Sequence, residues 1–332
     1  MRARQHHPAT RQAGLSLVEL LVALAIGVLI SLGIVNLFLQ SRVSAQQDEE
    51  TARLQENGRW ALRYLSRELA MAGFYGNNID GSAIATSLTF TSDCGTDWAM
   101  DSGVNLEHLD NASDAAATAT FDCMVTGEIV PGTDVLAFRR VKDSPAMLDG
   151  TAIVPVENNK VYLRLQSLGG SGQLLKGGDL SLADKAAGSG VDTWEYLPKL
   201  VFVRSYSQSP GDGISSLCVK RLSTDSSTVS VESTECLVEG VENLQVEFGL
   251  DEDIPPDYAA DYYTATPTAA QLESAISARI YILSRSVNEV QGYLNDKSYQ
   301  LGQTSVAANN DGYYRRILHS TVMLRNSSLY EF

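Results

Sequence analysis

The feature that most constrains this chain is an apolar run near its N-terminus. Residues 14–35 read GLSLVELLVALAIGVLISLGIV, and Glu19 is the one ionisable residue among them. As a helix, residues 15–35 would be about 31 Å long, which is enough to cross a bilayer. An ionised side chain inside such a helix is costly unless it has a partner. Any interpretation of the chain must therefore account for Glu19.

The rest of the chain has a globular composition. Of its 332 residues, 44% are hydrophobic and 20% are charged, which fits a folded domain with one anomalous segment. A net charge of −15 argues against a nucleic-acid partner, because phosphate binding needs a basic face. The sequence lacks the G-x-x-x-x-G-K loop and the H-E-x-x-H helix. His108 and His319 are isolated in the sequence, and isolated histidines are more often structural or surface residues than parts of a site. We therefore expect no enzyme and no cofactor.

The four cysteines favour disulfides. Cys94, Cys123, Cys218 and Cys236 form no C-x-x-C pair, so metal and thioredoxin-like interpretations are weak. An even number of cysteines after an export-like N-terminus indicates an oxidising compartment. Three connectivities are possible, and we favour Cys94–Cys123 with Cys218–Cys236 because each closes a short local loop.

Three interpretations of the N-terminus compete. Residues 1–14 are basic, so this end stays in the cytoplasm and the chain beyond the apolar run is exported. An ordinary secretory signal would have a shorter apolar segment. A plain transmembrane anchor explains the length but leaves Glu19 unpaired in lipid. Cleavage between Gly14 and Leu15, in contrast, would create an amine one helical turn from Glu19.

The third interpretation matches a known signal. Gly14, the LSLVE after it and the long apolar run resemble the class III signal of type IV prepilins and type II secretion pseudopilins. The resemblance implies that prepilin peptidase cuts after Gly14 and methylates the amine of Leu15. It also implies that Glu19 pairs with the N-terminal amine of a neighbouring subunit during assembly. Asn36 stands where many major pilins have proline, which leaves open whether this helix partly melts in a filament.

The helical pattern continues beyond the apolar run. Apolar and small residues from Leu54 to Ala72 recur at spacings of three and four, and the opposite face is rich in arginine. The pattern predicts one helix over residues 15–72, about 87 Å long, with Gly73 as its C-cap. Two helices broken within residues 41–47, where polar residues cluster, are the alternative.

Short β patterns follow the helix. The stretch from residue 82 to about Gly127 has weak periodicity and is interpreted as a long loop, stapled by the Cys94–Cys123 disulfide. Gly/Ser/Asp tracts such as LGGSGQLLKGGD separate the later patterns. Alternation then predicts strands over 134–141, 161–165, 200–207, 217–222, 237–249, 276–286 and 314–325. One long helix followed by a mostly antiparallel β head is an α+β arrangement, and with the prepilin-like signal it implies a type IV pilin-like fold.

The later segments sharpen the resemblance. Residues 236–253, 276–286 and 313–326 resemble the C-terminal half of the PilW family of minor pilins. We expect four parts: a leader peptide (1–14), a transmembrane or filament-core helix (15–40), an amphipathic half of that helix packed on the head (41–73), and a periplasmic β-rich head (74–332).

An acidic loop is the one candidate metal site. Asp251, Asp253 and Asp257 crowd a proline-containing loop, and hard oxygen ligands at such spacing could hold calcium. The loop has neither the glycine nor the terminal glutamate of an EF-hand. We therefore favour a solvated acidic loop and expect no metal.

The resemblance implies a minor pilin of a type IV pilus, a low-copy structural subunit that helps to prime assembly and lies near the tip. Its partners would be prepilin peptidase, the inner membrane, the major pilin and other minor pilins, with a tip adhesin as a further one. The protein would be held by a single helix in the inner membrane, with a periplasmic head, before joining the extracellular pilus. The alternatives are a J-type minor pseudopilin of type II secretion and a membrane-anchored periplasmic adhesin or receptor.

Overall fold

The computed structural model describes residues 14, 16–76, 81–86, 88, 90–92, 94, 98–166, 171–224, 229–231 and 233–326. These residues belong to two compact units, residues 1–49 and 50–332. The helix α1 (Leu17–Met71) begins in the first unit and ends in the second. Most of the expected leader, residues 1–13, lies outside the described residues, as does Leu15.

The predicted long helix is confirmed. α1 is a single α-helix with nearly the predicted bounds, and the alternative break within residues 41–47 is wrong. The helix ends just before Gly73, whose φ of +76° is the left-handed conformation that favours glycine after a helix. A Cβ at this position would lie 2.7 Å from Asn105, so the close approach also favours glycine.

In the first unit, the helix has an apolar surface on all sides. Every residue from 16 to 42 is exposed, including Leu17 and Leu37 at 76% and 68%. By length and composition this segment could cross a membrane, with a mean hydropathy of 2.7 over its most apolar window. A helix that is apolar all round needs an apolar environment, because exposing that surface to water is costly.

In the second unit, α1 is buried along one stripe. Its buried residues recur at intervals of three and four, which keeps them on one face: Glu50, Leu54, Gly58, Ala61, Leu65, Glu68 and Leu69. At Gly58 a Cβ would lie 2.6 Å from the side chain of Leu318 and 3.1 Å from that of Ser284. Ser284 donates a hydrogen bond to the carbonyl of Leu54 at 3.1 Å. The close approach explains a glycine in mid-helix, where it costs about 1 kcal/mol relative to alanine.

A four-stranded antiparallel sheet packs on this stripe, in the order β15-β14-β16-β19. Its strands are β14 (Val241–Leu250), β15 (Tyr262–Thr264), β16 (Ser277–Arg285) and β19 (Arg315–Met323). Val246 and Ile280 from this sheet share one buried cluster with Leu65 and Leu69 of α1. The helix is therefore part of the hydrophobic core.

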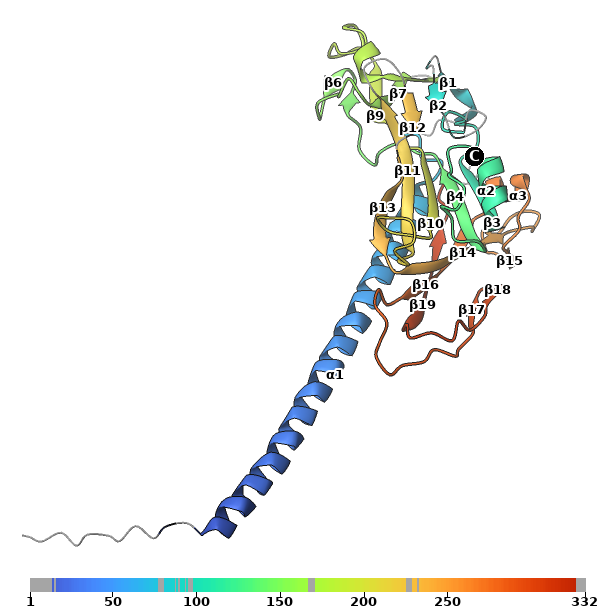
Figure 1. The fold of residues 1–332 in the computed structure, drawn as a ribbon. Coiled ribbons are helices and arrows are strands. Elements are labelled where there is room, and N and C mark those ends of the chain that lie inside the picture. Colours follow the sequence, from blue (N-terminus) through green and yellow to red (C-terminus); the bar gives the residue numbers. More distant parts are fainter. Residues whose placement is uncertain are drawn as a thin grey trace, which may run out of the picture. The chain divides into compact units, whose positions relative to one another are not determined.

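A seven-stranded sheet forms the centre of the head (Figure 1). Its order is β2-β12-β11-β10-β4-β3, with β13 also paired to β11. The strands are β2 (Phe90–Ser92), β3 (Leu106–Ala112), β4 (Thr133–Phe138), β10 (Lys199–Arg204), β11 (Ser216–Thr224), β12 (Val229–Val231) and β13 (Glu235–Glu239). Every residue of β4 and β10 is buried, because α1 and the four-stranded sheet cover one face and a second hydrophobic cluster covers the other. Burial on both faces explains their nearly continuous apolar sequences.

A six-stranded sheet of order β1-β8-β7-β9-β5-β6 lies at the end of the head remote from the small hairpin β17–β18 (Figure 1). The strands are β1 (Ile84–Thr86), β5 (Met147–Leu148), β6 (Thr151–Ala152), β7 (Val161–Gln166), β8 (Gly172–Lys176) and β9 (Val191–Glu195), and the hairpin strands are β17 (Tyr299–Leu301) and β18 (Thr304–Val306). Among the described strands, only the pairs β1–β8 and β2–β12 are parallel. The prediction of a mostly antiparallel α+β head is confirmed.

Two sequence predictions about the head were wrong. The stretch interpreted as a long loop contains β3 and a short helix, α2 (Asp114–Thr120), which Ser113 caps by accepting a hydrogen bond from Ala116 N. The alternation of β3 was hidden because its buried His108 is polar. The tract LGGSGQLLKGGD contains β8, whose central residue Leu174 is fully buried.

One predicted strand is divided in two. Residues 237–249 fall in β13 and β14, which are separated by Gly240 with a φ of +79°. Gly240 N donates to the carbonyl of Ser215, and its own carbonyl accepts from Arg285 N. The backbone thus passes from the central sheet to the four-stranded sheet at Gly240. A Cβ at this position would lie 2.6 Å from the Arg285 carbonyl oxygen, so the close approach favours glycine.

A buried ion cluster joins α1 to the central sheet. Glu68 accepts two hydrogen bonds from Arg140, at 2.8 and 3.0 Å, and a third from Lys199 at 2.6 Å. The three side chains are at most 9% exposed. Burial raises the pKa of Glu68, but the Arg140 hydrogen bond and the Lys199 and Arg140 charges outweigh it and hold the pKa below its ordinary value. Glu68 is therefore ionised in the folded protein.

Replacing Glu68 by alanine should lower the free energy of unfolding by about 3–5 kcal/mol, because two buried cations lose their counter-charge. Urea unfolding of the detergent-solubilised chain measures this loss. Glu56→Ala, at an exposed position of the same helix, is the matched control and should change stability by about 0.5 kcal/mol or less. An equal loss in both variants would contradict the assignment.

The same interaction predicts a pH dependence. Because the folded pKa of Glu68 is depressed, its contribution is complete above the unfolded value of 4.5 and is lost as the pH falls through the lower folded value. The difference in stability between the wild type and Glu68→Ala should therefore be constant near neutral pH and shrink below about pH 4.5.

Candidate functional site

The start of α1 carries a capping box. Ser16 N donates to Glu19 Oε2 at 3.2 Å, and Glu19 N donates to Ser16 Oγ at 3.2 Å. This reciprocal pair satisfies two of the backbone donors that a helix leaves free at its N-terminus. The S-x-x-E spacing in the sequence signals this motif, although it was not among the features predicted above. Glu19 thus has a local role in helix initiation.

The capping box places the acid at a definite point. Glu19 lies in the first turn, where the positive end of the helix dipole favours a carboxylate. Gly14 is exposed, and a Cβ built on it would meet nothing within 4 Å. Leu15, the expected first residue of the mature chain, lies outside the described residues. The described part of this segment is therefore an exposed backbone followed by a capped apolar helix.

The second half of α1 presents an arginine face, which we define as Arg59, Trp60, Arg63 and Arg67. All four residues are exposed, and the indole of Trp60 stacks on the ring of Tyr64 with centroids 5.3 Å apart. Arg67 pairs with Asp143 at 2.7 Å on the surface. Arginine and tryptophan are enriched where proteins bind one another, so the arginine face is a candidate contact surface.

The structure contains two disulfides, Cys94–Cys123 and Cys218–Cys236. These are the two local pairs expected from the sequence, closing separations of 29 and 18 residues. Cys218 and Cys236 face each other across β11 and β13, so this bridge links neighbouring strands of the central sheet. Loops of this size correspond to about 3 kcal/mol each when the unfolded state is constrained.

In the acidic loop, the carboxylates that lie together differ from the three considered as candidate calcium ligands. Asp251 and Asp253 lie close together, but their third neighbour is Asp261, and the predicted Asp257 is outside the group. Asp257 instead accepts a hydrogen bond from Ala259 N at 2.8 Å. Asp251 accepts hydrogen bonds from Asp253 N and Tyr258 N, which explains the arrangement as a hydrogen-bonded turn. The loop is largely exposed, and we assign no function to it.

His108, which is isolated in the sequence, is buried and paired in the structure. Its Nε2 is 2.8 Å from Asp134 Oδ2, and the side chains are 2% and 0% exposed. His108 and Asp134 lie on different strands, 26 residues apart, so no local sequence pattern indicates the pair. The other later histidine, His319, is exposed on β19 and stacks on Tyr281.

Comparison with known families identifies both ends of the chain. Residues 9–35 match the Prokaryotic N-terminal methylation motif, and residues 202–326 match the family of the Type IV Pilus-assembly protein W, PilW. The two matched segments are those of a PilW-like type IV pilin. The first match contains Gly14 and Glu19. The second contains all four strands of the sheet that packs on α1.

A solved structure is also similar to the PilW-like pilin. The type IV-like pilin TTHA1219 from Thermus thermophilus matches with 11% identity over 83% of this chain and 99% of that one. The TM-score of this match is 0.34. No curated protein matches the chain. The PilW-like pilin is thus identified from its two family matches, together with its long helix and β head.

The N-terminal motif also has an implication for processing and assembly. It is of the kind that prepilin peptidase processes, so this PilW-like pilin is expected to be processed and to assemble with other pilins. Its exposed apolar helix fits a membrane-anchored pilin. Family and fold are those of a structural subunit.

Proposed function

We propose that this PilW-like pilin is a minor pilin of a type IV pilus, which helps to prime assembly and lies near the tip. The observation that carries the proposal is an ionisable side chain, Glu19, in the first turn of an apolar helix with no covering protein surface among the described residues. The capping box gives this carboxylate a hydrogen bond from the backbone but no counter-charge.

Cleavage after Gly14 would supply the counter-charge. The new amine of Leu15 would directly precede the cap residue Ser16, about one helical turn before Glu19. In an apolar phase, such an amine on a neighbouring subunit would be attracted to the carboxylate much more strongly than in water. Glu19 would then align neighbouring helices, and methylation of Leu15 would follow cleavage.

The proposed division of the chain follows from the same reasoning. Residues 1–14 are the leader, 15–40 the helix that occupies the inner membrane and later the filament core, 41–73 the half of the helix packed on the head, and 74–332 the head. Two disulfides support a periplasmic head, because that compartment is oxidising. After assembly the protein would be part of the extracellular pilus.

The size of the head supports a low-copy position. A compact head of residues 74–332 has a radius of gyration of roughly 18 Å, whereas a helix is about 10–12 Å across. Such heads would crowd one another if every position in a filament carried one. At an end of the filament, neighbours lie on one side only. We infer that the arginine face contacts these neighbours, which would be other minor pilins and the major pilin, and that a tip adhesin could occupy the free side.

Two other functions are tested by the same experiments. A J-type minor pseudopilin of type II secretion would be processed identically but would copurify with a secretion system. A membrane-anchored adhesin or receptor would keep its leader. An enzymatic function is not proposed, because the functional features described above belong to processing and assembly.

Mass spectrometry of the N-terminus tests processing. We expect a mature chain that begins at Leu15 with a methylated amine, because glycine leaves the preceding backbone accessible to a peptidase. Gly14→Val should leave an uncut precursor in the inner membrane, whereas Thr10→Val, a substitution of similar size in the leader, should be cut normally. Residues 43–45 read VSA, which loosely fits the small-residue cleavage site of an ordinary secretory signal, so a mature chain that begins at Gln46 would instead indicate that signal.

The charge and the cap of Glu19 can be separated by mutation. Glu19→Gln keeps a side chain that completes a capping box but removes the charge. Ser16→Ala removes the cap and keeps the charge. If the carboxylate pairs with a neighbouring amine, Glu19→Gln should be processed yet reduce the number of filaments as severely as deletion of the protein, and Ser16→Ala should not. Electron microscopy counts the filaments, and a normal number with Glu19→Gln would limit the residue to helix capping.

Quantitative proteomics of sheared filaments tests the tip position. We expect trace amounts of this protein relative to the major pilin, together with a sharp fall in filament number when it is deleted, because a priming subunit acts once per filament. A content comparable with that of the major pilin would rule out the tip position. Copurification with secretion components alone would favour the pseudopilin alternative.

A further inference from the structure

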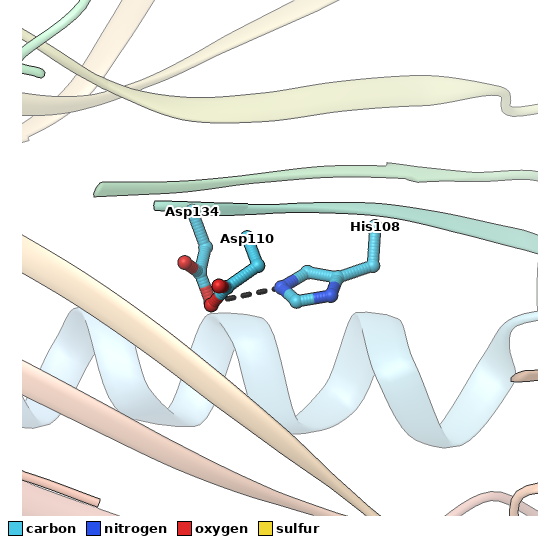
Figure 2. Close-up of side chains that lie close together, drawn as sticks. All are labelled: His108, Asp110 and Asp134. Atoms are coloured by element: carbon cyan, nitrogen blue, oxygen red, sulfur yellow. Dashed lines mark hydrogen bonds and ion pairs between the residues drawn. The ribbon is translucent and has the colours of Figure 1, made fainter. Parts of the chain in front are cut away.

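Two neighbouring strands of the head bring an imidazole and two carboxylates together (Figure 2). His108 and Asp110 lie on β3, and Asp134 lies on β4. One ligand atom from each residue lies within 4.8 Å of the other two. Figure 2 shows the three side chains converging on one point, with the contact between His108 and Asp134 drawn as a dashed line.

The pairing of β3 with β4 and a β-bulge at its end position these side chains. His108 and Asp110 are two residues apart, so a regular strand would place both on one face. The register between β3 and β4 shifts between Leu109 and Ala112, and Asn111 within the shift has a φ of +45°. The backbone N–H of Asn111 donates to Asp134 Oδ1 at 2.9 Å. The bulge thus helps to hold Asp110 beside Asp134. The left-handed conformation of Asn111 costs free energy, which the contacts of the surrounding structure must offset.

The surrounding structure fixes the other two side chains. Asp134 Oδ2 accepts a hydrogen bond from Val246 N of β14 at 2.7 Å. The imidazole of His108 packs against the ring of Phe248, also on β14, with centroids 5.1 Å apart. Outer contacts of this kind orient metal ligands before an ion binds.

Asp110 is the incompletely satisfied member of the group. Its Oδ1 is buried and receives no hydrogen bond from the described residues. Its other oxygen accepts a hydrogen bond from Asn111 Nδ2 at 3.1 Å. Both oxygens of Asp134 accept hydrogen bonds from the backbone, so Asp110 Oδ1 is the carboxylate oxygen of this group that lacks a partner among the described residues.

One divalent cation would balance the group. When bound to a metal ion, the two carboxylates are ionised and the imidazole is neutral, so the three ligands together carry a charge of −2. One nitrogen and two oxygens are a ligand set for first-row transition metals such as zinc, whereas calcium prefers oxygen alone. We propose that His108, Asp110 and Asp134 form a binding site for one divalent transition-metal ion, represented by Zn²⁺.

The contact between His108 and Asp134 is already close to the spacing of two zinc ligands. Zinc bonds of about 2.0 Å in tetrahedral geometry place two ligand atoms about 3.3 Å apart. The present separation of 2.8 Å between His108 Nε2 and Asp134 Oδ2 would need to widen only slightly. The ion would replace this contact and give Asp110 Oδ1 its missing partner. Since Asp134 also binds the backbone of β14, the ion would tie the central sheet to the four-stranded sheet.

Zinc binding by the full chain in detergent tests the proposal. His6 and His7 are replaced by alanine in every sample, and no histidine tag is used, so that they do not contribute binding. The protein is stripped with a chelator and dialysed, and then titrated with zinc chloride. We expect one zinc ion per chain by elemental analysis and a rise in melting temperature that the chelator reverses. Failure of the wild-type chain to bind zinc would overturn the proposal without any variant.

Matched variants locate the ion. Asp110→Asn keeps the size of the side chain but supplies a weaker, neutral ligand, and should bind zinc at least about tenfold more weakly. His108→Gln should lose binding. Asp251→Asn in the acidic loop and His319→Gln on β19 should bind as the wild type does. If Asp110→Asn also binds like the wild type, the zinc is adventitious and His108 with Asp134 forms an ion pair only.

Discussion

The head depends on the burial of one face of α1. Leu65 and Leu69 share a hydrophobic cluster with residues of the central sheet, such as Val201, and of the four-stranded sheet, such as Ile280. The helix therefore packs against two sheets that do not pair with each other through any described strand. It also covers the second face of β10, which allows every residue of that strand to be buried. A head without this part of α1 would expose that cluster to water, at a cost of about 25 cal/mol for each Å² of apolar surface.

The features with a period or a local signature could be predicted from the sequence. The helix was predicted because its stripe recurs at intervals of three and four, and the main strands because they alternate or are continuously apolar. Gly14 and Glu19 were recognisable because the motif that contains them is contiguous. The capping box was equally local, because Ser16 and Glu19 are three residues apart, but it was not among the predictions.

The features that could not be predicted involve polar groups inside the head. β3 carries His108 inward, so its hydropathy does not alternate, and the partner Asp134 comes from another strand. Glu68 belongs to the half of α1 that is rich in charged residues, yet its two cationic partners, Arg140 and Lys199, are more than seventy positions away in the sequence. Such pairs satisfy each other only after the chain has folded, and a single sequence contains no local trace of them. Short strands such as β8 could not be predicted for a related reason. Their pairing with neighbouring strands holds them in place, and their own sequence has no clear strand pattern.

The length of the buried stripe has a mechanical consequence. The contacts from Glu50 to Leu69 are spread over about 28 Å of helix axis. At one end Asn288 binds Glu50 at 2.7 Å, and at the other Arg140 binds Glu68 with two hydrogen bonds. A pull along the axis would load these contacts in shear and all together, whereas a pull across it would peel them one after another. Under axial tension, the helix can leave the head only when the whole stripe slides at once.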